Sequence, residues 1–360
     1  MLKKKKEYEF DFVIKGAYGT GNFGDDALFE VIYDKLPKGV EVAVIARDSE
    51  YLESNFENVK VFHPNSSVNI KCKYYIFGGG TQFYMFPNTN SLFYKINYHL
   101  RNPTYIIKKL LSLNLSVDYD NKIGIGLGLG PFYTRESKKF NRIINELNSF
   151  DKLYLRDKKS YDFCVDHNIN KIELNTDLCF SKKFKLTNSL DKRKVAVILR
   201  DWKHDEFGKK HFKAIRDYLL INRECCDLIL FSNDKYWIDF AIEHQLNYLV
   251  WDSTKYSSNE FIQKLAEYKL VISSRFHGII YSTLLNIPAI SIEIEPKLKI
   301  GAELNTGLIW NGEFTLDNLE QLIKKLEINY DEYMQFLSEI RNSKYTQSLE
   351  MFDNLKGRLG

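Results

Sequence analysis

The sequence predicts an α/β protein made of two Rossmann-like domains that face each other across a cleft. Short apolar runs alternate along the chain with segments of helical period, which is typical of βα units around a largely parallel sheet. The length of 360 residues fits two ordinary domains. A polar stretch without hydrophobic period, residues 181–194, separates two sets of units, so we predict domains at residues 1–185 and 186–360.

In the first half, runs rich in β-branched, aromatic and aliphatic residues predict the strands. These runs are residues 10–15, 40–46, 59–62, 73–77, 122–129, 153–156 and 171–174. A glycine-rich loop follows the first run, and acidic residues after it suit the start of a helix at 25–36. Glycine alternates with larger residues in the run 122–129, which indicates close approach of another backbone or of a ligand.

The second half continues the alternation of strands and helices. Its predicted strands are residues 195–199, 227–231, 248–250, 269–273 and 289–294. Its predicted helices are residues 211–222, 236–244, 259–268 and 278–285, the last stopped by Asn286 and Pro288. The final stretch, residues 316–355, is strongly helical, and we expect it to pack back on the first domain.

Composition excludes several classes of protein. An apolar share of 44% and an aromatic share of 14% exclude a disordered chain. The net charge of +4 is too small to indicate nucleic-acid binding. The five cysteines are odd in number and lack metal-ligand spacing, so we expect a reduced, cytoplasmic protein without a metal site. No apolar run has the length of a membrane span, and we expect no signal peptide.

Two basic features suit peripheral contact with the anionic inner surface of a membrane. They are the N-terminal lysines and residues 94–113, where basic side chains alternate with aromatic and aliphatic ones. A solvated amphipathic helix is the preferred interpretation of the second feature.

The segment of residues 271–278 places Arg275 and His277 where a short buried strand passes into a helix. In α/β folds this edge binds ligands, and the free N–H groups of the helix N-terminus favour anions. Arginine offers a permanent fork for phosphate or carboxylate, and histidine transfers protons near neutrality. A buried histidine beside a structural ion pair is the alternative.

The first loop, residues 16–27, follows a strand and opens a helix, but it has neither dinucleotide-fingerprint nor P-loop spacing. Asp25 and Asp26 in the first helical turn would repel a phosphate, whereas they suit sugar hydroxyls or the helix dipole. For Asp26, capping alone is an equal alternative. Asn22 and Asp25 are the better candidates for a ligand role.

The ordered set of motifs resembles the polysaccharide pyruvyl transferase family. The motifs are G-x-x-G-x-G-N-x-G-D-D-A at 16–27, F-G-G-G at 77–80, G-I-G-L-G-L-G-P at 124–131, L-R-D-x-x-S at 155–160, T-D-L at 176–178, I-L-R at 198–200, S-S-R-F-H-G at 273–278 and I-P-A-I-S-I-E-I-E-P-K at 287–297. The resemblance implies two facing Rossmann-like domains, similar to the GT-B glycosyltransferase architecture. It also implies transfer of the pyruvyl group of phosphoenolpyruvate to a sugar as a cyclic ketal.

The resemblance implies a donor site in the second domain. His277 would be the general acid that protonates the methylene carbon. Arg200 and Arg275 would bind phosphate or carboxylate, and the N–H of Phe276 is a further donor. Lys297 matches the family's lysine, although Glu295-Pro296 departs from the usual Tyr-Asp before it. Lys297 is equally consistent with a surface residue.

On the acceptor side we predict residues that can hydrogen-bond sugar hydroxyls. They are Asn22, Asp25, Gly79, Gly80, Thr81, Gln82 and Asp177. Arg156 is expected to be structural, bracing a strand end through Asp157 or Asp177. We expect no metal and no cofactor, because phosphoenolpyruvate is a co-substrate and arginines neutralise its charge.

Two other functions remain consistent with the sequence. A GT-B-type glycosyltransferase would use a nucleotide sugar, for which Glu293 and Glu295 offer a faint ribose-binding signature. A non-catalytic family member would bind a glycan, but it would have no reason to keep Arg200, Arg275 and His277 together. The acceptor is predicted to be a sugar of a surface polysaccharide or its lipid-linked precursor.

Overall fold

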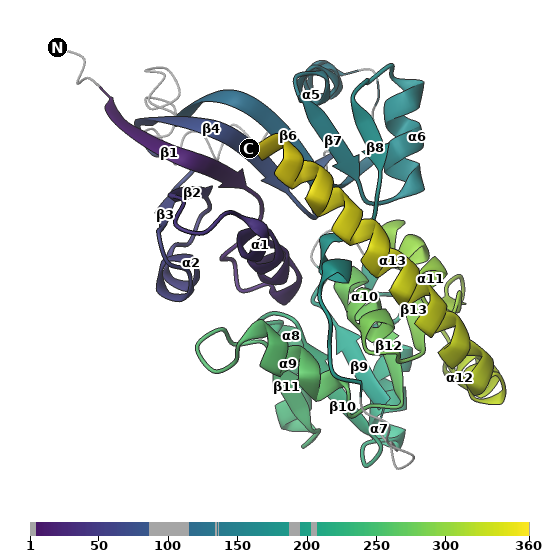
Figure 1. Ribbon diagram of the computed structural model, residues 1–360. Coiled ribbons are helices and arrows are strands. Elements are labelled where there is room, and N and C mark those ends of the chain that lie inside the picture. The colour runs from purple at the N-terminus through teal and green to yellow at the C-terminus, as the bar shows by residue number, and fades with distance from the viewer. Residues whose placement is uncertain are drawn as a thin grey trace. The chain divides into compact units, whose positions relative to one another are not determined.

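The computed structural model describes residues 5–85, 115–133, 135, 137–186, 195–202 and 207–359. The chain divides into two compact units (Figure 1). Unit 1 comprises Met1–Thr20 and Leu28–Leu178, and unit 2 comprises Gly21–Ala27 and Cys179–Gly360. The predicted residues Asn22 and Asp25 therefore belong to unit 2, although they stand early in the sequence.

Unit 1 is built on a parallel sheet with the strand order β3-β2-β1-β4-β6-β7-β8, and β5 pairs with β6. The strands are β1 (Lys6–Lys15), β2 (Val42–Ile45), β3 (Val59–Phe62), β4 (Val68–Gly78), β5 (Thr81–Met85), β6 (Ser116–Phe132), β7 (Lys152–Leu155) and β8 (Ile172–Leu174). All described strand pairs are parallel, so both faces need cover. The helices are α1 (Phe23–Lys35), of which residues 23–27 belong to unit 2, α2 (Glu50–Asn55), α5 (Lys138–Asn148) and α6 (Lys158–Asp166).

The glycines of β6 allow side chains of the same unit to approach the strand. A Cβ at Gly126 would overlap the side chain of Leu178, and a Cβ at Gly128 would lie 2.8 Å from Arg156 Nε. The close approach that the glycine pattern predicts is therefore made at these two positions by side chains, one aliphatic and one cationic.

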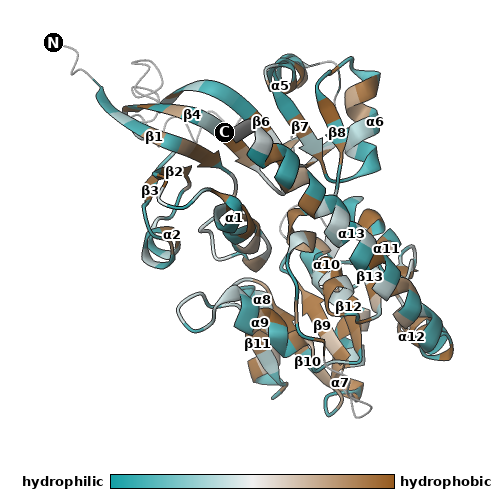
Figure 2. Cartoon of the chain, viewed as in Figure 1, coloured by the Kyte–Doolittle hydropathy of each residue, from teal (hydrophilic) through white to brown (hydrophobic). Residues whose placement is uncertain are grey.

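Unit 2 is built on a second parallel sheet with the order β11-β10-β9-β12-β13-β14. Its strands are β9 (Val195–Leu199), β10 (Cys226–Leu230), β11 (Tyr248–Val250), β12 (Leu270–Ser273), β13 (Ala289–Ile292) and β14 (Ile309–Trp310). The central strands are predominantly apolar, as Figure 2 shows by their brown colour, and β12 and β13 are buried at every residue. Strands buried on both faces require this continuous hydrophobicity.

The helices of unit 2 follow its strands in alternation. They are α7 (Phe212–Ile221), α8 (Lys235–Glu243), α9 (Ser258–Leu265), α10 (Phe276–Leu284), α11 (Lys297–Glu303), α12 (Leu316–Ile328) and α13 (Tyr330–Leu359). Capping residues in the sequence mark where two of these helices begin. Ser257 and Glu260 form a capping box at α9, and the Thr315 side chain accepts from the N–H of Asn318 at α12.

Two parallel sheets with helices confirm the predicted α/β fold class. Sequence periodicity did not reveal α2, β5, α5, α6, α11 or β14, and the tail consists of two helices, α12 and α13. The predicted membrane-contacting stretch 94–113 and residues 187–194 of the predicted linker lie outside the described residues. Within the described chain, no helix has both the length and the apolar character needed to cross a membrane.

Candidate active site

The parallel pairing of β9 with β12 brings two predicted arginines to one edge of the unit 2 sheet. Arg200 follows the last residue of β9, and Arg275 lies two residues after β12. The N–H of Ser274 donates to the carbonyl oxygen of Ile198 at 2.9 Å, which extends the contact between the two strands. This is the carboxyl edge, where open α/β sheets bind ligands.

The guanidinium of Arg275 is held by four hydrogen bonds within unit 2. Nε donates to the carbonyl oxygen of Leu199 at 3.1 Å, and Nη1 donates to Asn22 Oδ1 at 3.1 Å. Nη2 donates to Ser232 Oγ and Asp234 Oδ2. A guanidinium has five N–H donors, so these bonds fix its orientation and use most of its capacity.

The charge environment of Arg275 follows from this arrangement. Its side chain is 12% exposed, and its carboxylate partner Asp234 is 8% exposed. Burial lowers the pKa of Arg275, the Asp234 carboxylate acts in the opposite direction, and the positive charge of Arg200 adds to the lowering. The charges of the two arginines therefore interact at this edge of the sheet.

Arg200 has the more open guanidinium of the two, with 21% of its side chain exposed. Nη1 lies 2.9 Å from Glu295 Oε1, and Lys297 Nζ lies 3.0 Å from the same oxygen. The guanidinium carbon lies 4.7 Å from the ring centroid of Trp202. Among the described residues, Arg200 donates only through Nη1, to Glu295. The edge formed by Nε and Nη2 can therefore donate two parallel hydrogen bonds to an anion.

His277 lies in the first turn of α10 and packs against the backbone of the glycine-rich loop. A Cβ at Gly24 would overlap the His277 ring, first at Nδ1. The ring centroid lies 5.6 Å from that of Phe276, whose side chain is buried. Glycine at position 24 therefore leaves the space that the imidazole occupies. Phe276 is the first residue of α10, where backbone N–H groups lack intrahelical acceptors.

The segment Gly21–Ala27 docks into unit 2 through Phe23. Its N–H donates to the carbonyl oxygen of Phe231 at 2.8 Å. The buried ring of Phe23 packs against four aromatic rings with centroids 5.0–5.2 Å away. These rings belong to Phe231, Trp251, Phe261 and Tyr281. Asp26, 1% exposed, accepts from Trp251 Nε1 at 3.2 Å.

This docking carries two predicted ligand residues to the arginine edge. Asn22 accepts from Arg275 and donates through Nδ2 to Asp25 Oδ2. The carbonyl oxygen of Asn22 accepts from the N–H groups of Asp25 and Asp26, at 3.0 and 3.1 Å. Asn22 and Asp25 were predicted on the acceptor side, and the structure brings both to the candidate donor residues of unit 2.

The other predicted acceptor residues belong to unit 1. Arg156 Nη1 lies 2.8 Å from Asp177 Oδ2, and Nη2 donates to Thr81 Oγ1 at 3.2 Å. Arg156 is 7% exposed and Asp177 is 1% exposed. Gln82 Nε2 lies within 3.2 Å of the carbonyl oxygens of Lys15, Gly78 and Gly79. These contacts brace the strand ends, as expected for Arg156, and acceptor binding by this group stays a prediction.

Sequence reasoning missed Ser232 and Asp234. Both follow β10, which pairs with β9, so they reach the same carboxyl edge. Asp234 Oδ1 also accepts from the N–H of Asp201 at 2.9 Å, which ties the residue after Arg200 to the Arg275 network. Polar residues directly after a predicted strand were a signal that could have identified them.

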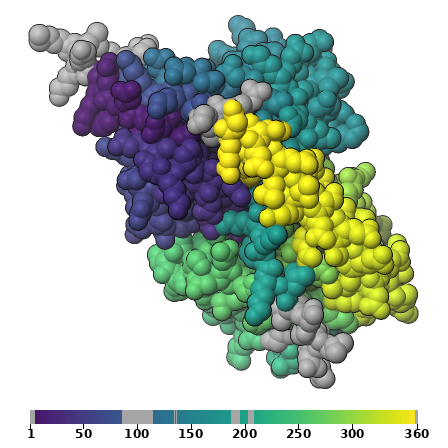
Figure 3. All heavy atoms as spheres, viewed as in Figure 1, coloured from purple at the N-terminus to yellow at the C-terminus, as the bar shows by residue number. Residues whose placement is uncertain are grey.

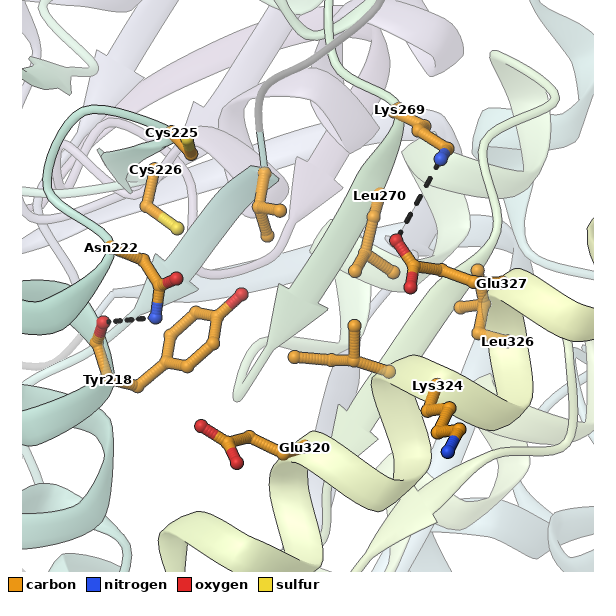
Figure 4. Close-up of a pocket in the computed structure, with 12 residues that line it drawn as sticks. Tyr218, Asn222, Cys225, Cys226, Lys269, Leu270, Glu320, Lys324, Leu326 and Glu327 are labelled. Carbon is orange, nitrogen blue, oxygen red and sulfur yellow. Dashed lines mark hydrogen bonds and ion pairs between the residues drawn. The ribbon is translucent and has the colours of Figure 1, made fainter.

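A cavity of about 680 Å³ lies elsewhere in unit 2 (Figure 4). It includes Val195, Cys226 and Leu270, which are the first residues of β9, β10 and β12. It therefore lies at the amino edge of the sheet, opposite Arg200 and Arg275. Figure 4 shows Lys269 paired with Glu327, at 3.8 Å, and the described lining contains no histidine, so this cavity has no group for proton transfer near neutrality.

Comparison with solved structures shows likeness of fold. The structure of Anabaena HepE with UDP-glucose has 10% identity and a TM-score of 0.56, over 97% of this chain and 99% of that one. A glycosyltransferase from Rickettsia africae has 11% identity and a TM-score of 0.52, over 99% of both chains. S. aureus MnaA with UDP has 11% identity and a TM-score of 0.53, over 98% and 97%. These likenesses support the GT-B-like fold class.

Sequence comparison identifies the family. No curated protein matches the chain in sequence. The model of the polysaccharide pyruvyl transferase family matches residues 22–296, which include Asn22, Arg200, Arg275 and His277. The match covers most of the chain, and the protein belongs to the polysaccharide pyruvyl transferase family.

Proposed function

We propose that this protein transfers a pyruvyl group from phosphoenolpyruvate to a sugar of a surface polysaccharide or its lipid-linked precursor, forming a pyruvate ketal. The observation that carries the proposal is one sheet edge that combines Arg200, Arg275 and the loop of His277 in a chain of this family. Phosphoenolpyruvate is a small dianion or trianion, and such a ligand requires clustered cations. It is a cytoplasmic metabolite, so the proposed reaction is cytoplasmic.

In the proposed site the two arginines have different roles. Arg200 binds the phosphate or carboxylate through its open edge, and Lys297 adds a second positive charge beside it. Most N–H donors of Arg275 are bonded to other residues of the chain. Arg275 therefore positions Asn22 and the His277 loop, and it contributes mainly its charge to anion binding. The N–H groups at the start of α10 supply further anion donors.

The proposed reaction balances with His277 as the single proton-transfer group. Protonated His277 donates to the methylene carbon, C2 becomes electrophilic, and the first sugar hydroxyl adds there and returns its proton to the imidazole. The C2–O bond to phosphate then breaks as His277 protonates the departing oxygen. The second hydroxyl adds at C2 and gives up its proton, which restores His277. One ketal and one phosphate form, and the steps require no cofactor.

A GT-B-type glycosyltransferase is the competing function. The similar structures solved with UDP or UDP-glucose favour it, although at 10–11% identity their likeness concerns the fold. A non-catalytic glycan-binding role would need neither donor.

The experiment is a thermal unfolding series with phosphoenolpyruvate or UDP-glucose added to wild type and His277→Gln. A ligand that binds only the native state raises the midpoint with its concentration. We expect phosphoenolpyruvate to raise the midpoint of both proteins, because His277 acts on the proton and not on the anion. A rise with UDP-glucose alone would support the glycosyltransferase, and no rise with either would reject the proposed donor.

A further inference from the structure

A second cavity of unit 2, of about 390 Å³, opens beside helix α13. The segment of residues 182–186, the C-terminal end of α10 and the middle of α13 line it. Figure 3 shows this segment, in teal, against the yellow surface of α13. The N-cap Arg275 and the lining residue Leu284 lie at opposite ends of α10, roughly 13 Å apart at 1.5 Å per residue, so the cavity is distinct from the arginine edge.

Arg341 has no counter-charge among the described residues of this cavity. Within the described chain its guanidinium makes no hydrogen bond or ion pair, and Nη1 is buried without an acceptor. Burial lowers the pKa of Arg341, and no Asp or Glu of the described chain is among the causes of the shift. A partly buried guanidinium that lacks acceptors is unfavourable, and a bound anion would satisfy it.

The rest of the lining combines positive charge with apolar surface. Lys182 and Lys183 line the cavity with Arg341, and no Asp or Glu stands among the described lining residues. Lys183 Nζ lies 4.4 Å from the ring centroid of Tyr345. Phe184 and Leu284 supply the apolar wall. The volume lies in the range of small-ligand sites.

We propose that this cavity binds a phosphoryl group, carried either by a lipid at a membrane surface or by a soluble phosphate compound. The three cations bind the phosphoryl oxygens, and the apolar wall packs against the group that carries them. The site is distinct from the proposed donor site, since none of its lining residues belongs to the arginine edge.

Equilibrium dialysis with labelled inorganic pyrophosphate tests the soluble source, and flotation with phosphatidylcholine vesicles, with or without phosphatidic acid, tests the lipid source. The variants are Arg341→Gln and, as a matched control on the same helix, Lys356→Gln, which removes an exposed cation paired with Asp353. We expect Arg341→Gln to weaken binding at least tenfold and Lys356→Gln to leave it unchanged. The thermal midpoint of Arg341→Gln should not fall, because the substitution removes no hydrogen bond or ion pair of the described chain. Lys183→Gln, at an exposed position, provides a second variant.

Arg200→Gln separates this site from the arginine edge, because it should leave the Arg341-dependent binding intact. Binding of pyrophosphate, or recruitment to phosphatidic acid vesicles, that depends on Arg341 supports the proposal and identifies the source. Equal binding by wild type and Arg341→Gln, or no binding of either probe, would overturn it.

Discussion

The imidazole of His277 occupies space that exists only because residue 24 has no side chain. A Cβ at Gly24 would overlap the ring, so the loop and the histidine must fit each other. Proton transfer depends on positioning to within fractions of an ångström, and small displacements of a catalytic group cost large factors in rate. The second residue of helix α1 is thus part of the proposed catalytic geometry.

Gly24→Ala is expected to lower the turnover rate about 100-fold, because the methyl group displaces His277. Phosphoenolpyruvate binding should change little, so the effect should appear in kcat rather than in the dissociation constant. Gly357→Ala is the matched control, since Gly357 is also helical and a Cβ there meets no atom within 4 Å. Wild-type kcat in Gly24→Ala would contradict the role given to this contact.

Asp234 orients Arg275, so Asp234→Asn should weaken phosphoenolpyruvate binding about tenfold by releasing the guanidinium. The carboxylate accepts from Arg275, Ser232 and the N–H of Asp201, and its loss should also lower stability by about 3 kcal/mol, as for a broken buried pair. Asp239→Asn removes an exposed carboxylate of α8 and provides the control. Calorimetric titration measures the affinity, and equal affinities in both variants would make Asp234 dispensable for binding.

His211 gives the protein a specific pH dependence of stability. Its side chain is fully buried beside Phe212 and Phe314, and burial lowers its pKa from 6.5 to about 3. Between these values the unfolded chain binds one proton more than the native protein, so the free energy of unfolding falls as pH falls, by about 1.4 kcal/mol per pH unit. Above pH 6.5 this contribution is complete.

The test compares wild type with His211→Phe in denaturant unfolding at pH 4.5, 5.5 and 7. We expect the difference in unfolding free energy to shift in favour of the variant as pH falls. His244→Phe replaces a partly exposed histidine and controls for the exchange of histidine for phenylalanine. Parallel pH profiles for wild type and His211→Phe would show that His211 does not titrate on unfolding.

Helix α1 is divided between the two units. Its residues Phe23–Ala27 belong to unit 2, while Leu28 onward belongs to unit 1. Phe23 is the anchor of the unit 2 part, because its ring is fully buried among four other aromatic rings. The anchor holds Asn22 where it accepts from Arg275.

Phe23→Ala is expected to destabilise the protein by about 3–5 kcal/mol, the cost of removing a fully buried aromatic ring. The same variant should lose phosphoenolpyruvate affinity, because Asn22 is no longer held against Arg275. Phe336→Ala provides the control, since Phe336 is 39% exposed on α13. A thermal midpoint for Phe23→Ala equal to that of the control would exclude the anchoring role.

The sequence predicted most strands of both sheets because a strand buried on both faces must be apolar. It did not predict α6, or α5 although that helix is strongly amphipathic, or β5, which begins at Thr81 within a polar loop signal. Neither the motifs nor periodicity indicated that Asn22 would accept from a guanidinium 253 positions later. That contact depends on tertiary packing of Phe23, which no local pattern encodes.

At the scale of the whole molecule, the family match extends over residues 22–296 and therefore begins within the segment that docks into unit 2. Arg200 and Arg275 were predictable from the sequence, because each follows a strand and parallel strands end at the same edge. Their division of roles was not, because it depends on Ser232, Asp234 and Glu295, which lie on other loops of the same edge.

The proposed function requires that the carboxyl edge of the unit 2 sheet bind phosphoenolpyruvate through Arg200. Calorimetric titration of wild type, Arg200→Gln and Lys299→Gln with phosphoenolpyruvate tests it without knowledge of the acceptor. Lys299 is exposed on α11 and controls for the loss of one positive charge. We predict at least tenfold weaker binding for Arg200→Gln and no change for Lys299→Gln, because a charged hydrogen-bonding partner is worth about 1.5–3 kcal/mol. Equal affinity of Arg200→Gln and wild type would show that Arg200 does not bind phosphoenolpyruvate.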